Sequence, residues 1–250
     1  MPGAPVSVIV PVYGNQDTLE ELHGRIATAL APTPIEFIYV DDAGPDDSRR
    51  VLARLAEKDH RVRVVRMASN VGQHAAVLVG LAHATGHQVA VLDADLQDPP
   101  EVLPELFRRL GDGYEAVFGG RTGSYQSLPR LVASRGFKLL LTAVAGVPTD
   151  AGLFVAMSRD MVQRVVAYPP SQPHVVAMIG HSRLPMLSVP VDRMERPSGA
   201  SEYTFTARLR LAFQGLTWRI RFGRSARSSV HPALPAHTVI EPPRSRSDAQ

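Results

Sequence analysis

The sequence predicts a doubly wound α/β fold with a mostly parallel sheet and helices on both faces. Short, continuously apolar segments alternate with helix-like segments of about 10 to 15 residues through the first half of the chain. A second observation is that each of the first five apolar segments is followed by a polar cluster. Ligands of such sheets bind outside the carboxyl ends of the strands, so these clusters predict a binding site there.

The expected elements follow one another in a regular order up to residue 118. Strands are expected at 6–12, 36–40, 62–65, 89–92 and 116–118, and helices at 19–30, 48–57, 73–84 and 101–110. Beyond residue 121 the alternation weakens, and we expect helices over 128–144 and 204–213 and strands over 153–157 and 185–191. One domain over residues 1–222 should therefore precede a tail, 223–250, that is rich in Arg, Ser and Pro and partly disordered.

The composition is that of an ordinary soluble globular protein, with 44% hydrophobic and 20% charged residues. The absence of cysteine excludes disulfides, thiolate metal sites and cysteine nucleophiles, and it fits a cytoplasmic protein. No stretch approaches the roughly 18 apolar residues of a membrane span, and the first 13 residues lack the basic start of a signal peptide. The net charge of +3 is modest, and we expect no nucleic-acid partner.

Polar residues stand at the carboxyl end of every one of the first five strands. They are Tyr13–Asn15, Asp41–Asp42, Ser69–Asn70, Asp93–Asp98 and Gly119–Arg121. Because the carboxyl ends of parallel strands lie at one edge of the sheet, these clusters are expected to form one site.

Asp93 and Asp95 are the most informative pair, because they follow an apolar run and are one residue apart. Residues i and i+2 of a strand point to the same face, so both carboxylates can hold one cation. Hard oxygen ligands favour Mg²⁺ or Mn²⁺, which would neutralise a diphosphate leaving group. The alternative is an Asp-rich turn that caps a helix starting at Pro99.

Asp41 and Asp42 form the second acidic cluster. A carboxylate there can accept the imide proton of uracil or the N1–H and N2–H groups of guanine, which would make Asp42 or its neighbour a reader of the base. The alternative is that one of them caps the helix beyond Gly44. The chain has neither a Gly-x-Gly-x-x-Gly segment after the first strand nor a Walker lysine, which disfavours dinucleotide and P-loop sites.

Four motifs in order carry a family resemblance. They are Val-Pro-Val-Tyr (10–13), Val-Asp-Asp-Ala-Gly-Pro-Asp-Asp-Ser (40–48), Asn-Val-Gly-Gln-His-Ala-Ala (70–76) and Asp-Ala-Asp-Leu-Gln-Asp-Pro-Pro-Glu (93–101). Together they resemble family 2 glycosyltransferases of the GT-A fold, in particular the subgroup that transfers sugars to dolichol or undecaprenyl phosphate. The last motif is highly specific to this subgroup, and the likeness extends over about residues 5–217.

The resemblance implies a metal-dependent, inverting transfer of a sugar from a UDP- or GDP-linked donor to polyprenyl phosphate. It implies that Asp93, Asp95 and Gln97 hold Mg²⁺ or Mn²⁺. The residues expected to bind the nucleotide sugar are Pro11, Val12, Tyr13, Asn15, Asp41, Asp42, Asn70, Gly72, Gln73, Asp93, Ala94, Arg196, Ser201 and Tyr203. Asp95, Arg121 and Arg135 are expected to be catalytic, the arginines by meeting the acceptor phosphate. Such a phosphate is already anionic and needs cationic positioning more than a general base.

The chain also departs from the family pattern. Glu202 stands where lysine is common, Gln16 where glutamate is common, and Val155 where an arginine is usual. Most relatives with the loop around Glu202 continue into transmembrane helices or at least a membrane-seeking tail, and from this sequence we expect neither. The segment Arg208–Phe222, with four arginines, Trp218 and Phe222, suits peripheral contact with the inner face of a membrane, or equally a helix packed on its own domain.

Two other functions remain open from the sequence. The same donor chemistry can serve a soluble acceptor, such as a secondary metabolite, a nucleoside or a sugar phosphate, and a hydroxyl acceptor would need a base, for which Asp150 is the candidate. The other hypothesis is a non-catalytic domain that binds a nucleotide sugar. His74 is interpreted as a structural helix residue rather than a ligand or base, and the sequence specifies no oligomeric state.

Overall fold

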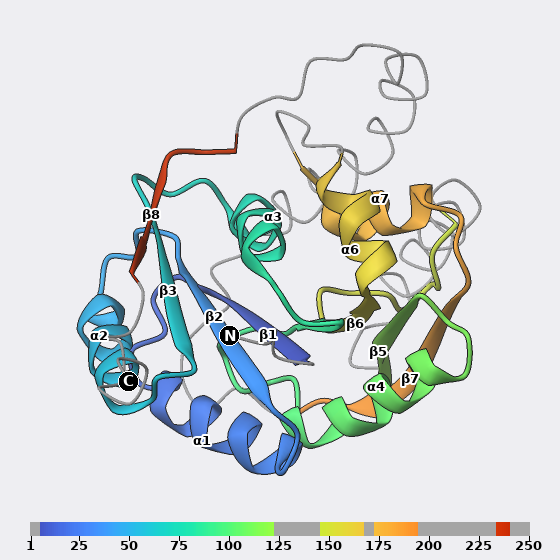
Figure 1. Cartoon of the computed structure of the whole chain (residues 1–250), viewed down its shortest axis with the longest axis horizontal. Coiled ribbons are helices and arrows are strands. Elements are labelled where there is room, and N and C mark those ends of the chain that lie inside the picture. The colour runs from blue at the N-terminus through green and yellow to red at the C-terminus, as the bar shows by residue number, and fades with distance from the viewer. Residues whose placement is uncertain (1–5, 123–145, 168–172, 195–233, 241–250) are drawn as a thin grey trace, which may run out of the picture.

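The computed structural model describes residues 6–122, 146–167, 173–194 and 234–240, with the side chains of Arg121 and Thr122 left out (Figure 1). In these residues eight strands form one sheet, in the order β7-β5-β6-β4-β1-β2-β3-β8. The strands are β1 (Val6–Val12), β2 (Ile35–Asp41), β3 (Val62–Met67), β4 (Gln88–Val91), β5 (Ala116–Thr122), β6 (Val155–Ser158), β7 (Met186–Asp192) and β8 (His237–Ile240).

The described helices cover both faces of this sheet. They are α1 (Leu19–Leu30), α2 (Ser48–Lys58), α3 (Gln73–His83), α4 (Leu103–Gly111), α6 (Arg159–Val166) and α7 (Val175–His181), with a short 3₁₀ turn, η1 (Pro100–Val102), before α4. Figure 1 shows α1, α2 and α4 on one face and α3, α6 and α7 on the other. None of the helices in the described part of the chain is long and apolar enough to cross a membrane.

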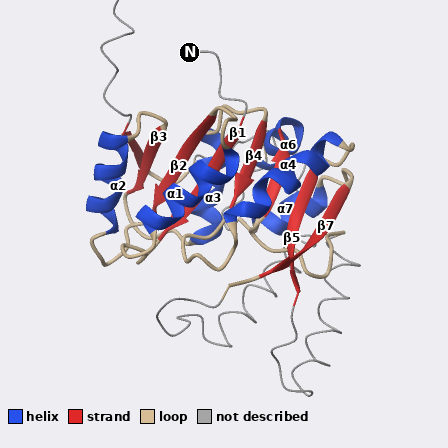
Figure 2. Cartoon of the chain, turned by 90° about the horizontal axis from the view of Figure 1, so that it is seen from below, coloured by secondary structure: helices blue, strands red, loops and turns tan. Residues whose placement is uncertain are grey.

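The two faces are packed by alternate residues of the same strands. In β1, Val8 and Val10 belong to the core under α1, α2 and α4, whereas Ile9 belongs to the core under α3, α6 and α7. This alternation is the two-residue period of a strand whose two faces are both buried. Figure 2 shows the sheet from another side, with the strands next to one another.

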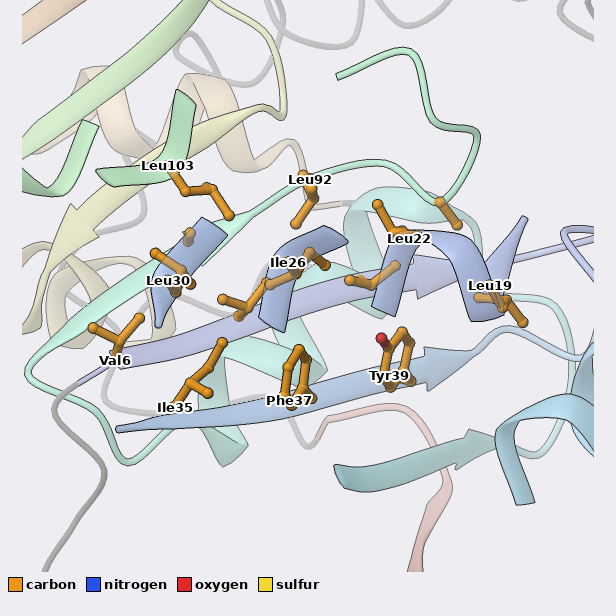
Figure 3. Packing of buried hydrophobic residues seen from close by; sticks show 14 of the residues in the cluster. Val6, Leu19, Leu22, Ile26, Leu30, Ile35, Phe37, Tyr39, Leu92 and Leu103 are labelled. Atoms are coloured by element: carbon orange, nitrogen blue, oxygen red, sulfur yellow. The ribbon is translucent and has the colours of Figure 1, made fainter. Parts of the chain in front are cut away.

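Helix α1 follows the spacing of an amphipathic helix. Its buried residues, Leu19, Leu22, Ile26 and Leu30, recur every three or four positions and so form one apolar stripe. Figure 3 shows this stripe above Phe37 and Tyr39 of β2, all of them in the same core. The loops at the ends of β1 and β2 thus extend from strands that pack against α1.

The predicted α/β architecture is confirmed, as a mixed sheet. Strands β1 to β4 are parallel, and so are β5 and β7, but β6 runs antiparallel to β4 and β5 and β8 antiparallel to β3. The residue pattern of a four-residue strand such as β6 does not show whether the strand runs parallel or antiparallel to its neighbours. The elements expected before residue 118 all exist, with α4 preceded by η1.

Some elements were missed, and some predictions cannot be compared. Helices α6 and α7 and strand β8 were not predicted, and β8 lies inside the segment assigned to the tail. A four-residue edge strand whose side chains are half-buried or exposed gives little pattern to recognise. The helices expected at 128–144 and 204–213 lie outside the described residues, and the division at residue 222 stays a prediction.

Candidate active site

The carboxyl ends of β1 to β4 carry four loops that are tied to one another. Val12 of β1 is in register with Asp41 of β2, which is in register with Arg66 of β3, so these strands end at one level. The hydroxyl of Thr18 in the first loop donates to the carbonyl oxygen of Ala94 in the fourth, at 2.6 Å. The polar clusters of the first four strands are therefore neighbours, as their positions in the sequence predicted.

The first loop presents one exposed aromatic ring, that of Tyr13, at this edge of the sheet. The amide of Tyr13 donates to Oδ1 of Asn15 at 3.0 Å, and the amide of Asn15 donates to the hydroxyl of Ser48 at 3.1 Å. Pro11 and Val12 are buried, so any contact of Val12 with a ligand would be through its backbone. Of the residues in this loop expected to bind the nucleotide sugar, Tyr13 and the half-buried Asn15 thus have accessible side chains.

The second loop packs directly on the first. A Cβ at Gly44 would lie 2.8 Å from the amide nitrogen of Gly14, so only glycine allows this close approach. The loop leads into α2, whose N-terminal amide at Ser48 donates to Oδ1 of Asp46 at 3.1 Å. Asp41 and Asp42 do not occupy this position, so the alternative that one of them caps α2 is wrong.

Asp42 joins the second loop to the third. Its buried carboxylate accepts the amide of Val71 at Oδ1 (2.7 Å) and the amide of Gly72 at Oδ2 (2.9 Å). Burial raises the pKa of Asp42, while these two amides act in the opposite direction. Each carboxylate oxygen has two acceptor directions, so Asp42 can hold this loop and still accept a donor from a base. Asp41 is also buried, with Oδ2 3.7 Å from Nε of Arg49.

The third loop ends in the start of α3. Oδ1 of the exposed Asn70 accepts the amide of Gly72 at 2.9 Å, and Gly72 has φ = +86°, a conformation that favours glycine. The next residue, Gln73, donates from Nε2 to Oδ1 of Asp93 at 2.6 Å. This contact brings the third loop against the fourth.

The fourth loop contains the predicted cation ligands. Asp93, Asp95 and Gln97 are half-buried, whereas the intervening Ala94 and Leu96 are buried. The alternation arises in a turn and not in a strand, because β4 ends at Val91 and Leu96 has φ = +61°. Strand periodicity therefore does not describe this loop, and a shared cation site for Asp93 and Asp95 stays a prediction.

The donor set of this loop fits a hard cation. Among the described residues, no cluster of three or more His, Cys, Asp or Glu side chains could hold a metal ion. Asp93 and Asp95 instead provide two carboxylates, with the Gln97 amide beside them, and Mg²⁺ commonly combines one or two carboxylates with substrate phosphates. No side chain caps η1 or α4, which removes support from a purely helix-capping turn.

The same loop is also held by contacts with residues that the sequence analysis did not single out. The side chain of Asp98 is fully buried, and its Oδ1 lies 2.5 Å from Nη2 of Arg193. The amide of Met194 donates to the carbonyl oxygen of Gln97 at 3.1 Å. Thr18, Arg193 and Met194 thus support the loop across long sequence separations, for which a single sequence carries no signal.

Asp150 lies beside the carboxyl half of β5. Its Oδ2 accepts the hydroxyl of Ser188 at 2.8 Å, and a Cβ at Gly120 would overlap both groups. Gly120 is therefore required for the carboxylate to lie against the strand. Arg121 follows on β5, opposite Val191, but its side chain is outside the description. Arg135, Arg196, Ser201, Glu202, Tyr203 and the segment 208–222 also lie outside the described residues.

His74 is a packing residue, as interpreted from the sequence. Its Nδ1 accepts the amide of Val175, and its ring stacks on that of His174 with the centroids 4.3 Å apart. Burial, with a smaller effect from His174, lowers the pKa of His74 to about 3. The ring is therefore neutral at ordinary pH and joins α3 to α7.

Known proteins resemble this chain in sequence and in fold. Residues 7–165 match the family described as Glycosyl transferase family 2. An undecaprenyl-phosphate 4-deoxy-4-formamido-L-arabinose transferase of Klebsiella pneumoniae (strain 342) is 33% identical over 221 residues, which cover 86% of this chain and 68% of that protein. The corresponding protein of K. pneumoniae strain ATCC 700721 / MGH 78578 is 32% identical over the same length.

Two solved structures share the GT-A fold at lower identity. A mannosyltransferase of Pyrobaculum calidifontis in complex with GDP-Man and Mn²⁺ has a TM-score of 0.61 at 23% identity, covering 92% of this chain and 66% of that one. Glucosyl-3-phosphoglycerate synthase of Mycobacterium tuberculosis, in complex with Mn²⁺, UDP-glucose and phosphoglyceric acid, has a TM-score of 0.63 at 23% identity, covering 87% and 80%.

Proposed function

This chain belongs to glycosyl transferase family 2 and is a glycosyltransferase, and on that premise we propose that it transfers a sugar from a UDP- or GDP-linked donor to polyprenyl phosphate. The transfer would be inverting and would require Mg²⁺ or Mn²⁺. The observation that carries this proposal is the half-buried Asp93, Asp95 and Gln97 on a loop that hydrogen bonds connect to the loops of Asp42 and Tyr13. The residues expected to hold the cation and those expected to bind the nucleotide are thus on neighbouring loops.

The relatives support the substrates at different levels. The acceptor is suggested by the name of the Klebsiella relative, which includes undecaprenyl phosphate and which is 33% identical across most of this chain. The donor class and the cation are suggested by the complexes with GDP-Man or UDP-glucose and Mn²⁺. Because one of these donors carries guanosine and the other uridine, they do not favour either base.

The described residues suggest a division of roles. Asp93, Asp95 and Gln97 would hold the cation, which when bound supplies positive charge to the diphosphate leaving group. Asp42 would accept a hydrogen bond from an N–H group of the nucleotide base, and Tyr13 would lie against the nucleotide. An oxygen of polyprenyl phosphate would attack the anomeric carbon of the sugar, and the bond from this carbon to the nucleoside diphosphate would break. This step needs no proton transfer. Arg121 and Arg135 would position the acceptor phosphate, and Arg196, Ser201 and Tyr203 the donor.

A soluble acceptor is the second candidate, and Asp150 is the observation that favours it. The carboxylate lies beside the carboxyl half of β5 and is oriented by Ser188, as a general base would need to be. Transfer to a hydroxyl requires such a base, whereas transfer to a phosphate does not. Replacement Asp150→Asn should therefore spare the first reaction and abolish the second.

A transfer assay tests the proposal directly. A panel of UDP- and GDP-sugars is offered with Mn²⁺ or Mg²⁺ and with either a short polyprenyl phosphate or phosphoglyceric acid, and Asp95→Ala serves as the blank. Cation-dependent transfer to the lipid phosphate supports the proposal. Transfer to phosphoglyceric acid alone, or donor hydrolysis alone, would move the acceptor to the soluble class. Binding of every donor without turnover would leave a non-catalytic nucleotide-sugar-binding domain.

Peripheral membrane contact is a separate part of the proposal. The segment 208–222 would bring the acceptor's membrane surface to the site from the cytoplasmic side. Co-sedimentation with vesicles containing anionic lipid tests it: the wild-type chain should sediment with them, and a variant with Arg208, Arg210, Arg219 and Arg221 changed to Ser should not.

A further inference from the structure

We infer that Gln73 is a positioning residue that fixes the Asp93 carboxylate for cation binding, an inference that rests on the proposed metal-dependent transfer. The contact behind it is the hydrogen bond from Nε2 of Gln73 to Oδ1 of Asp93, at 2.6 Å. This bond joins the first residue of α3 to the first acidic residue of the fourth loop.

The position of Gln73 is itself fixed. The two amides directly before it, those of Val71 and Gly72, are held by the Asp42 carboxylate at 2.7 and 2.9 Å. The carbonyl oxygen of Gly72 then accepts the amides of Ala75 and Ala76, each at 3.0 Å, and so begins the helix. The backbone of Gln73 is therefore held in place by these hydrogen bonds. Its side-chain amide can then determine the orientation of the Asp93 carboxylate.

The chemistry of an amide suits this role. A glutamine donates a hydrogen bond without adding charge, whereas a lysine in its place would neutralise Asp93 and compete with a cation. With Gln73, the carboxylate keeps its whole negative charge but loses rotational freedom. Partners of this kind, which hold a metal ligand from behind, typically contribute 10- to 100-fold to metal affinity.

The hydrogen bond also joins the two halves of the site. Asp42 is expected near the base of the donor and Asp93 near its diphosphate, and the three-residue path Val71, Gly72, Gln73 connects them. Cation affinity is thus set partly by a residue that itself need not touch the cation.

The test is a Mn²⁺ titration of the intact chain in the presence of UDP or GDP, followed by electron paramagnetic resonance. Gln73→Met keeps the length of the side chain and removes the donor, so Mn²⁺ affinity should fall about 10- to 100-fold. The matched control is Gln88→Met, because Gln88 donates to the carbonyl oxygen of Phe107 at 3.3 Å, at the start of β4 and away from this edge. Its Mn²⁺ affinity should equal that of the wild type.

Three further readouts separate positioning from a general structural effect. The Mn²⁺ concentration that gives half-maximal transfer should rise for Gln73→Met by the same factor as the Mn²⁺ dissociation constant. Nucleotide affinity in EDTA should not change, because the inference assigns Gln73 to Asp93 and not to the donor contact expected from the sequence. In the background of Asp93→Asn, Gln73→Met should cause no additional loss, because the residue acts through Asp93. Gln73→Asn, with a shorter amide, provides a second variant with the same expected loss if the first does not fold.

The outcomes distinguish the inference from the proposed function. If the wild-type chain binds no Mn²⁺ with either nucleotide, both are overturned. If the wild type binds Mn²⁺ and Asp93→Asn does not, but Gln73→Met and Gln73→Asn bind like the wild type, only the inference is overturned. A loss of nucleotide affinity in EDTA would instead make Gln73 a direct ligand of the donor.

Discussion

The guanidinium of Arg193 lies 2.5 Å from the carboxylate of Asp98, whose side chain has no exposed surface. This ion pair holds the last acidic residue of the Asp93–Asp98 loop to the end of β7. Because the Asp98 side chain is fully buried, the pair can affect a ligand only through the shape of the loop.

Removing one partner of this pair should destabilise the fold strongly. Arg193→Ala leaves a buried carboxylate without its cation, which typically costs about 3 to 5 kcal/mol. Urea unfolding of the wild type and the variant measures the change in unfolding free energy. The control is Arg108→Ala, because Arg108 pairs with Glu105 in solvent, where the loss of one partner should change the unfolding free energy little. Equal changes in unfolding free energy for Arg193→Ala and Arg108→Ala would contradict a stabilising role of the buried ion pair between Asp98 and Arg193.

Replacement of Gly120 should displace Asp150 without removing any charged group. In Gly120→Ala the new Cβ would overlap Oδ2 of Asp150 and Oγ of Ser188, so the carboxylate must move. A displacement of about 1 Å can cost on the order of 100-fold in rate if the carboxylate takes part in the reaction. The measurement is kcat/KM with each acceptor class, and Gly111→Ala, where a Cβ meets nothing within 4 Å, is the control. An unchanged kcat/KM would exclude Asp150 from the reaction.

The buried His74 should make stability sensitive to acid. Its pKa is about 3 in the folded chain and near its ordinary value of 6.5 after unfolding, so between these values protons bind the unfolded state more tightly. The unfolding free energy should therefore fall as the pH drops below about 6.5. His74→Phe should flatten this part of the profile, measured by denaturant unfolding from pH 7 to pH 4, while kcat at pH 7.5 should stay within about two-fold of wild type. A profile as steep as that of the wild type would mean that other groups cause the effect.

Asp59 should produce a second loss of stability at lower pH. Burial acts to raise the pKa of Asp59, but the hydrogen bonds and charge of Arg61 hold it at about 2. A carboxylate with a depressed pKa stabilises the fold above its ordinary pKa near 4, and that contribution is lost as the pH falls towards 2. Asp59→Asn should show a smaller slope of unfolding free energy between pH 4 and pH 2. Because this residue lies away from the carboxyl edge, a changed KM for the donor would not fit this assignment.

Metal removal should separate the cation-dependent step from the stability of the fold. EDTA should abolish transfer, and Mn²⁺ or Mg²⁺ should restore it, while the thermal midpoint without donor changes little because Asp93 and Asp95 lie in a loop on a packed sheet. Differential scanning calorimetry with and without EDTA provides the check. A large fall of the midpoint in EDTA would indicate a structural metal instead.

The sequence was sufficient for the edge of the sheet that carries the site. Apolar strands ending in Tyr13, Asp42, Asn70 and Asp93 predict neighbouring loops, because parallel strands end at the same side. The same reasoning did not reach Thr18, Ser188 or Arg193, whose contacts join residues far apart in the chain. Side chains that support a site from a distance have no local pattern, and only the fold brings them together.

Conformation inside the loop was equally beyond a periodic pattern. Leu96 adopts φ = +61°, which a leucine rarely does outside a constrained turn, so strand spacing does not describe the backbone between Asp95 and Gln97. The antiparallel direction of β6 was similarly hidden, since the residue pattern of a four-residue strand does not show in which direction the strand runs.

Strand β8 closes the outer edge of the sheet next to β3, with Ile240 opposite Val64. During synthesis, β3 leaves the ribosome long before β8, so its unpaired edge is available to other nascent chains until residues 237–240 follow. The nascent protein is therefore expected to need protection of β3 by chaperones, and ribosomes stalled before residue 237 should yield chains that aggregate through this edge.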